Sequence, residues 1–141
     1  MRKLLLTSLL LASSTVTAQQ YDFKITRVVD GDTVEFEAPF LPEPLPPVLS
    51  LRILGVDTPE KGGRAKCSSE SVAGEHATEF TKLAIANSRT YRIDISKWDK
   101  FGGRVLGDVI IDGKSLHQML IDNNLAREYH GEAKKSWCGL F

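Results

Sequence analysis

The chain has 141 residues, with 18 basic and 18 acidic side chains, so its formal net charge is zero. This length fits a single domain, and the balanced charge excludes a protein that holds nucleic acid by overall positive charge alone. The two cysteines form no Cys-x-x-Cys pair and the three histidines are scattered, which argues against a structural zinc site.

Residues 1–18 have the pattern of a secretory signal peptide. Arg2 and Lys3 form a basic start, an apolar stretch follows, and small residues up to Ala18 suit cleavage. The apolar stretch is too short for a membrane span. We therefore expect a domain of residues 19–141 without a membrane anchor, periplasmic or secreted. Losing Arg2 and Lys3 would leave 16 basic against 18 acidic residues, a formal charge of −2.

The first half of this domain is expected to contain three strands. Residues 22–30 and 32–38 alternate between apolar and polar, and Asp30-Gly31 is a turn signal between them. Residues 39–47 are rich in proline, which lacks the backbone donor of an inner strand, so they predict a stiff, exposed loop. Residues 48–57 are mostly apolar and predict a third, largely buried strand.

The second half predicts two helices and two further strands. Apolar residues at helical spacing predict an amphipathic helix over residues 71–87. Strands are expected at 90–97 and 104–111. Ser115-x-x-Gln118 forms a capping box that opens a second helix, to about Asn123. Five strands with a helix after the third predict an α+β fold, with a small β-barrel and flanking helices.

Cys67 and Cys138 are an even pair in a chain expected to be exported, which favours one disulfide between them. Two free, buried thiols are the alternative. If the disulfide forms, it pins residues 134–137 against the loop that follows Glu60.

Two acidic clusters and two arginines carry the candidate chemistry. The clusters are Asp30-Gly31-Asp32-Thr33 and Asp57-Thr58-Pro59-Glu60. Carboxylates at strand ends offer oxygen ligands to a hard cation such as Ca²⁺. Arg52 and Arg104 bring guanidinium groups, which hold a phosphate through paired hydrogen bonds. Together these are the parts needed to hydrolyse a phosphodiester.

Two of these residues have a plainer interpretation. Arg52 lies in the most apolar stretch of the chain, where an unpaired guanidinium is very unfavourable. It therefore forms either a structural ion pair or a phosphate clamp. Asp30 is expected to close an Asx turn on its own backbone rather than to bind a metal.

The ordered set of motifs resembles the staphylococcal-nuclease (thermonuclease-like) family from about Lys24 to Tyr129. The motifs are Val29-Asp30-Gly31-Asp32-Thr33, Leu51-Arg52-x-x-Gly55-Val56-Asp57-Thr58-Pro59-Glu60, Asp99-Lys100-Phe101-Gly102-Gly103-Arg104 and Leu125-Ala126. This resemblance implies a five-stranded OB-fold β-barrel with two to three flanking helices, a fold whose open face commonly binds oligonucleotides.

The resemblance also implies a role for each matching residue. The metal ligands would be Asp32, Asp57 and the backbone carbonyl of Thr58. The catalytic residues would be Arg52, Arg104 and Glu60, with Glu60 as general base. The positions near the nucleotide match Lys100, Phe101 and Tyr129, where a ring could stack on a base. Phe101 could equally belong to the core.

The implied function is a Ca²⁺-dependent, sugar-nonspecific nuclease that leaves 3′-phosphate ends. Its substrates would be DNA and RNA, with single-stranded or flexible regions preferred, and it would act as a monomer. The alternative is a non-catalytic OB-fold module that binds oligonucleotides or a protein partner. The neutral charge favours this alternative, and the joint presence of Arg52, Glu60 and Arg104 argues against it.

Overall fold

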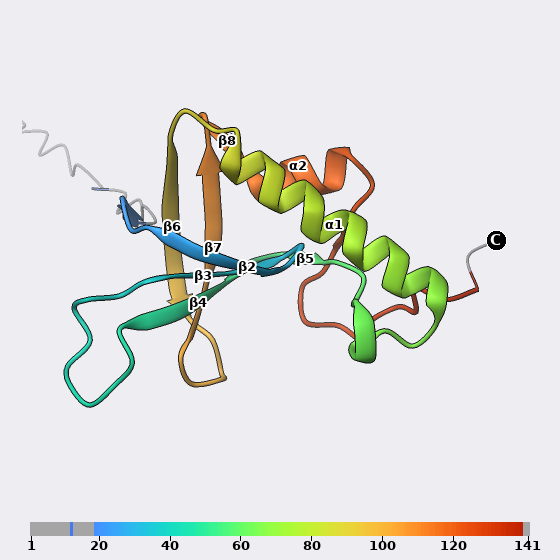
Figure 1. The fold of residues 1–141 in the computed structure, drawn as a ribbon, viewed down its shortest axis with the longest axis horizontal. Helices are drawn as coiled ribbons and strands as arrows, with labels where there is room; N and C mark the ends of the chain where they lie inside the picture. The colour runs from blue at the N-terminus through green and yellow to red at the C-terminus, as the bar shows by residue number, and fades with distance from the viewer. Residues whose placement is uncertain (1–11, 13–18, 140–141) are drawn as a thin grey trace, which may run out of the picture.

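The computed structural model describes residue 12 and residues 19–139, so the expected signal peptide lies almost entirely outside the described residues. The protein is built on one coiled, mixed sheet with helices along one side (Figure 1). The strand order in this sheet is β1 (Gln19–Tyr21), β6 (Tyr91–Trp98), β7 (Arg104–Ile111), β4 (Val48–Ile53), β3 (Thr33–Glu37) and β2 (Ile25–Asp30), and β8 (Lys114–Ser115) pairs with β7. A second, two-stranded sheet joins β5 (Val56–Asp57) to β9 (Arg127–Glu128).

The sheet topology places β4 at the centre of the molecule. β2, β3 and β4 pair antiparallel, while β4 and β7 pair parallel. A parallel pair needs a long crossover, and helix α1 (Ser68–Ala86) with strand β6 supplies it. A register shift between Ile95 and Lys97 in β6 bends the sheet. Gly107 of β7 lies opposite Ile95 of β6, next to this register shift. A Cβ at Gly107 would come within 1.8 Å of the Asp94 carbonyl oxygen.

Helix α1 packs along the β2–β3 turn. Ala77 is fully buried on this face, and the Thr81 hydroxyl donates to the Gly31 carbonyl at 2.8 Å. The helix begins at Ser68, three residues before the expected start, and a short 3₁₀ helix η1 (Gly62–Arg64) precedes it. The connection between β5 and α1 is therefore shorter than the interval between the expected strand and the expected helix.

The predicted capping box is confirmed in its first half. Helix α2 (Leu116–Asp122) begins where the Ser115 hydroxyl accepts from the Gln118 backbone N–H at 3.2 Å. Asn124 ends the segment with φ at 55°, the left-handed conformation that asparagine tolerates.

A single hydrophobic core lies inside the coiled sheet and beneath both helices. In β7 the buried residues alternate with half-buried ones, as expected for a strand with one face on the core. Leu116 and Leu120 of α2 are fully buried against the sheet. The large side chains from the strands that are fully buried are Phe36, Leu51, Ile53, Ile93, Val34, Val56 and Val109.

The prediction of an α+β fold with five principal strands and flanking helices is confirmed, but the third strand is not continuous. A turn at Leu54-Gly55 divides residues 48–57 into β4 and β5, and Gly55 has φ of 83°. A Cβ on Gly55 would approach the His117 ring to 2.8 Å, so both the conformation and the space require glycine. Within residues 19–139 no ladder joins β1 to β2, which leaves one seam of the barrel open. No helix in the described part of the chain is long and apolar enough to span a membrane.

Candidate functional site

The two predicted metal ligands converge on Arg52. Asp32 lies in the β2–β3 turn, Asp57 ends β5, and both carboxylates are buried. The β3–β4 register pairs Thr33 with Arg52, which brings the guanidinium beside the turn. Nη2 of Arg52 lies 3.7 Å from Asp32 Oδ2 and 3.7 Å from Asp57 Oδ1. Neighbouring strand ends thus bring together residues that are 25 positions apart in the chain.

The acidic centre, meaning Asp32 and Asp57 with the neighbouring Asp30, gathers three buried carboxyl groups. Burial, together with the charge of Asp30, raises the pKa of Asp32 to about 6, although Arg52 and the Thr58 backbone N–H lower it. That N–H donates to Asp32 Oδ2 at 3.1 Å. A carboxyl that burial drives toward its neutral form is stabilised in its charged form by a nearby cation.

The donor set fits a hard divalent cation. Asp32 and Asp57 offer carboxylate oxygens, and buried Thr58 follows Asp57 directly with its carbonyl. Oδ1 of Asp57 is buried, and the positive charges nearest to it are the Lys134 ammonium at 2.6 Å and the Arg52 guanidinium at 3.7 Å, so this oxygen already attracts cations. Oxygen donors of loose geometry are the ligands that Ca²⁺ accepts.

Asp30 does not close the Asx turn that the sequence predicts. Its Oδ2 instead accepts from Arg64 Nη2 at 3.0 Å, and its Oδ1 is buried without a hydrogen-bond partner. Arg64 Nε also lies 3.2 Å from Glu60 Oε2. The Asx interpretation of Asp30 was wrong because a guanidinium from the loop after Glu60 reaches the turn and pairs with the carboxylate.

The loop that carries Glu60 is organised by Glu70, in the first turn of α1. Glu70 is only 5% exposed, and its two carboxylate oxygens accept from the backbone N–H groups of Glu60, at 3.3 Å, and Lys66, at 2.7 Å. Sequence reasoning missed this residue. The available signal was an acidic residue in the first turn of a helix. The predicted start of this helix lay three residues too late, so Glu70 fell outside it.

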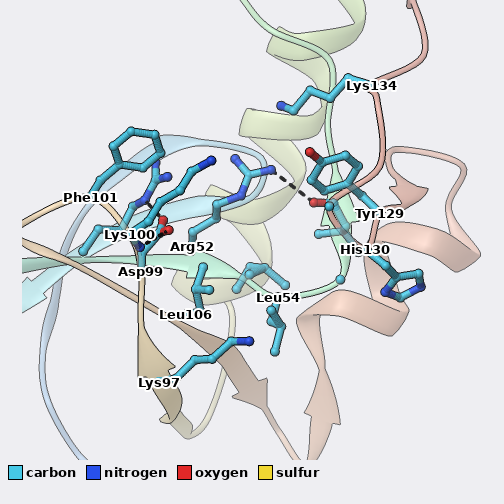
Figure 2. Close-up of a pocket in the computed structure, with 15 residues that line it drawn as sticks. Arg52, Leu54, Lys97, Asp99, Lys100, Phe101, Leu106, Tyr129, His130 and Lys134 are labelled. Carbon is cyan, nitrogen blue, oxygen red and sulfur yellow. Dashed lines mark hydrogen bonds and ion pairs between the residues drawn. The ribbon is translucent and has the colours of Figure 1, made fainter.

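A basic cleft of about 660 Å³ opens beside Arg52 (Figure 2). It is lined by the predicted substrate-binding and catalytic residues Arg52, Lys100, Phe101, Arg104 and Tyr129. Phe101 is 56% exposed, which excludes the core alternative. The Arg104 guanidinium lies 4.8 Å from the centre of the Phe101 ring, within cation–π range.

Asp99 holds Arg104 in the cleft. Nε of Arg104 donates to Asp99 Oδ2. Burial alone would raise the pKa of Asp99, but the hydrogen bonds from Arg104 and the Lys100 backbone N–H lower it below its ordinary value. The carboxylate therefore stays charged and orients the guanidinium.

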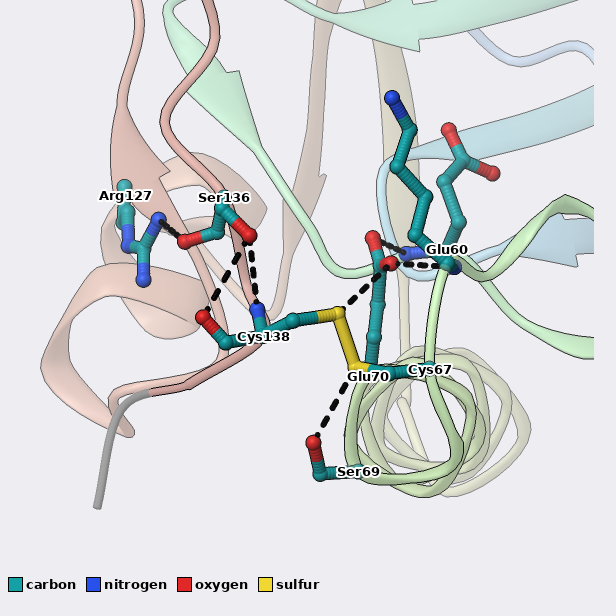
Figure 3. The surroundings of a disulfide bond; sticks show 8 residues. Glu60, Cys67, Ser69, Glu70, Arg127, Ser136 and Cys138 are labelled. Atoms are coloured by element: carbon teal, nitrogen blue, oxygen red, sulfur yellow. Dashed lines mark hydrogen bonds between the residues drawn. A yellow bond between two sulfur atoms is a disulfide. The ribbon is translucent and has the colours of Figure 1, made fainter.

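The C-terminal strap, residues 134–138, forms the opposite side of the site. The predicted Cys67–Cys138 disulfide is present, with the two Cα atoms 6.1 Å apart (Figure 3). It brings the strap beside the start of α1, which Figure 1 also shows. The strap lies beside the loop after Glu60, as the disulfide prediction implied, and a second cleft of about 360 Å³ is lined by both segments.

The strap contacts the acidic centre directly. Trp137 Nε1 donates to Asp57 Oδ2 at 3.2 Å, and Lys134 Nζ lies 2.6 Å from Asp57 Oδ1. Arg127 stacks its guanidinium 3.7 Å from the Trp137 ring and donates to the Ser136 carbonyl at 2.9 Å. Sequence reasoning placed the strap near Glu60 but assigned neither Lys134 nor Trp137 to Asp57, because only side-chain packing brings them there.

The predicted site residues thus fall into two adjoining groups. Arg52 shares the basic cleft with the residues proposed to bind nucleotide, while Asp57, Thr58 and Glu60 line the second cleft. Lys134 borders both clefts. Oxygen donors for a cation and guanidinium groups for a phosphate thus lie in adjoining clefts that meet at Arg52 and Lys134, an arrangement suited to a phosphate ester.

Comparison with known proteins places this arrangement in a family. The chain is 30% identical over 112 residues to a thermonuclease of Staphylococcus hyicus, covering 78% of the chain and 60% of that protein. It is 32% identical over 108 residues to the SPbeta prophage-derived endonuclease YokF of Bacillus subtilis (strain 168), covering 75% of the chain and 33% of that protein. The alignments therefore span less than two thirds of these relatives.

A third relative is endonuclease YncB of the same Bacillus subtilis strain, with 31% identity over 105 residues, covering 73% of the chain and 46% of that protein. Residues 50–137 match the family described as "Staphylococcal nuclease homologue", and this segment holds both arginines, Asp57, Glu60 and the strap as far as Trp137. Since the match covers more than half of the chain, the protein belongs to the staphylococcal nuclease family.

Proposed function

We propose that this protein is a Ca²⁺-dependent nuclease that hydrolyses DNA and RNA and leaves 3′-phosphate ends. The observation that carries the proposal is the convergence of two buried aspartates on Arg52, at the border of a cleft that also holds Arg104. Membership of a family whose relatives are named thermonuclease and endonuclease supports the same conclusion.

The metal would be held by Asp32, Asp57 and the Thr58 carbonyl. Bound there, Ca²⁺ would neutralise negative charge on a phosphate oxygen. We expect Mg²⁺ to substitute poorly, because it demands a strict octahedron and gives up its waters reluctantly.

The chain's own residues would carry the reaction. Glu60 orients a water molecule and accepts its proton as the water oxygen forms a bond to phosphorus. The bond from phosphorus to the 5′ oxygen breaks, and the departing 5′ oxygen takes up a proton from solvent water. Arg52 and Arg104 donate to the phosphate oxygens, whose negative charge increases in the transition state, and such donors commonly contribute a hundredfold or more. Glu60 lines the second cleft with a side chain that is 35% exposed, while its Oε2 is buried and lies 3.2 Å from Arg64 Nε.

The aromatic wall of the cleft favours unpaired bases. Phe101 is exposed, and Tyr129 lines the same cleft, so both rings are available for stacking. Stacking on a protein ring requires a base that is free of its own duplex. We therefore propose a preference for single-stranded or flexible regions.

Export of a monomer to the periplasm or medium completes the proposal. The basic and apolar N-terminal pattern and the disulfide both suit an oxidising compartment. Detection of the processed chain in the periplasm or medium, starting near Gln19, tests this part, and an uncleaved cytoplasmic product would contradict it.

Digestion assays test the activity. Single-stranded DNA, duplex DNA and RNA are incubated with Ca²⁺, with Mg²⁺ or with excess chelator, and the product ends are checked for phosphatase-sensitive 3′ groups. We expect cleavage with Ca²⁺ only, fastest on single strands, and loss of activity in Glu60→Gln. Turnover that persists in chelator would contradict the metal assignment. Binding of oligonucleotides without any cleavage would favour the non-catalytic OB-fold module, which the neutral charge of the chain supports.

A further inference from the structure

The Lys134 ammonium forms an ion pair with Asp57, one of the residues proposed to bind the metal. The ammonium lies 2.6 Å from Asp57 Oδ1, a buried carboxylate oxygen. The next cation is Arg52, at 3.7 Å from the same oxygen. In this structure Lys134 therefore provides the closest positive charge to Asp57.

A divalent cation that binds Asp57 Oδ1 must take the place of this ammonium. Two cations on one carboxylate oxygen repel each other strongly in a partly buried site. Lys134 would then lose its only ion-pair partner among the described residues. Its side chain is 44% exposed and its four-carbon stem is flexible, so the ammonium is free to turn elsewhere.

The strap itself is held in place while the side chain turns. The Cys67–Cys138 disulfide anchors its end, and Trp137 remains bonded to Oδ2, the other oxygen of Asp57. Arg127 fixes the strap backbone through the Ser136 carbonyl. An ammonium displaced from Asp57 therefore stays at the border of the basic cleft, where Figure 2 shows Lys134 and Tyr129 on the same side.

We propose that Lys134 is a further substrate-binding residue, which exchanges Asp57 for a nucleic-acid phosphate when the divalent cation binds. This inference rests on the proposed function and names a residue outside every motif that led to it. Because Lys134 opposes the metal in the free protein and assists the substrate in the metal-bound protein, metal and substrate bind cooperatively. Such coupling is reciprocal, since each ligand strengthens the other by the same factor.

Lys135 provides a matched control. It is the adjacent residue on the strap, it is exposed, and within the described chain it forms no ion pair and lines only the second cleft. Lys134→Gln and Lys135→Gln remove the same charge from the same segment. Only the first removes an ammonium from Asp57.

The experiment measures binding rather than cleavage. Calorimetry gives the Ca²⁺ affinity of each protein without nucleic acid, and fluorescence anisotropy gives the affinity for a labelled single-stranded hexathymidylate in Glu60→Gln proteins, with and without Ca²⁺. We expect Lys134→Gln to bind Ca²⁺ about three to ten times more tightly and, with Ca²⁺ present, to bind the oligonucleotide more weakly by a similar factor. Without Ca²⁺ its oligonucleotide affinity should equal that of the parent, and Lys135→Gln should show neither change.

Three outcomes would overturn the inference. One is unchanged Ca²⁺ affinity in Lys134→Gln. Another is an equal loss of oligonucleotide affinity with and without Ca²⁺, which marks a general surface charge. The third is the same pair of changes in Lys135→Gln. Failure of the proposed function looks different, because the unmodified protein would then bind no Ca²⁺ at all.

Discussion

The two sides of the site are built in different ways. On the barrel side, Asp32, Arg52 and Asp57 project from strands and turns whose backbone is held by ladder hydrogen bonds. On the other side, the strap of residues 134–138 belongs to no ladder and is held by one disulfide and by the side-chain contacts of Lys134, Trp137 and Arg127. The barrel side is therefore fixed by the fold, while the strap side depends on a few contacts that can be removed singly.

Removal of the disulfide should have the largest effect on stability. The bond closes a separation of 71 residues, for which loss of chain entropy in the unfolded state predicts a contribution of about 4 kcal/mol. We expect the Cys67→Ser, Cys138→Ser protein to unfold at a lower denaturant concentration, with an unfolding free energy that is lower by about 4 kcal/mol. Its activity should also fall, because the strap no longer holds Trp137 against Asp57.

The control for this experiment is reduction of the unmodified protein. Reduced and folded protein should match the double variant in both stability and activity. Full activity in the reduced, folded protein would mean that the disulfide serves stability alone, and the strap would then hold its position through side chains.

On the barrel side the largest effect should be on catalysis. Replacing Arg104 by Gln should lower kcat on single-stranded DNA about a hundredfold or more, as for other donors to a transition-state charge. Its side chain is 27% exposed and paired only with Asp99 in the described chain, so the fold should persist. Thermal unfolding is measured beside activity, and a folded Arg104→Gln with unmodified rates would remove this residue from the mechanism. Arg52→Gln should lose as much activity but also stability, because Asp32 and Asp57 would lose their shared cation.

Helix α1 packs against the backbone of the Glu60 loop at Gly74. A substitution at Gly74 therefore tests whether the helix sets the position of Glu60. A Cβ on Gly74 would lie 2.4 Å from the Glu60 carbonyl oxygen, closer than any real contact. Gly74→Ala should therefore cost about 1–3 kcal/mol of unfolding free energy, as overpacking does. It should also lower activity, since the loop that carries Glu60 must shift.

Gly63→Ala is the matched control, because a Cβ there meets nothing within 4 Å. It lies in the same loop and should leave both stability and activity close to those of the unmodified protein. If Gly74→Ala behaves like Gly63→Ala, the helix does not set the position of Glu60.

The sequence predicted the barrel side far better than the strap side, and the cause is physical. Strand ends, turn residues and a charge in an apolar strand are local signals, and together with the family resemblance they indicated Asp32, Arg52 and Asp57 as one candidate site. The roles of Arg64 and Glu70 depend on how a loop folds back on a helix, which no local pattern encodes. The position of the strap could be inferred from the cysteines, but the contact of Lys134 with Asp57 could not.

The turn between β4 and β5 shows how such signals fail even in the barrel. Residues 48–57 are apolar enough for one strand, yet Gly55 turns the chain and His117 lies against it. The signal was a glycine with positive φ, and φ is not visible in the sequence. The turn is held by His117 Nδ1, which lies 2.8 Å from the Leu54 carbonyl, and by its Nε2, which lies 3.2 Å from Glu128 Oε1.

This His117 contact should give the smallest effect, a dependence of stability on pH. Burial alone would lower the pKa of His117, but the Leu54 carbonyl, Glu128 and, more weakly, Asp108 raise it above its ordinary value. A raised pKa in the folded state adds stability that is fully present below the unfolded pKa, near 6.5, and is lost as pH rises through the folded pKa. Because Glu128 is half exposed, we expect a contribution of about 0.5 kcal/mol.

Glu128→Gln should remove part of this dependence. The difference in unfolding free energy between pH 5 and pH 8 should be smaller in the variant than in the unmodified protein. The His117 ring, followed by NMR, should titrate at a lower pH in the variant. His130 also faces Glu128, with its Nε2 at 3.6 Å, so His130→Gln serves as the control that leaves the His117 titration in place. If His130→Gln abolishes the pH dependence instead, the charge that matters lies outside the β4–β5 turn. In that case the β4–β5 turn does not depend on the charge of His117.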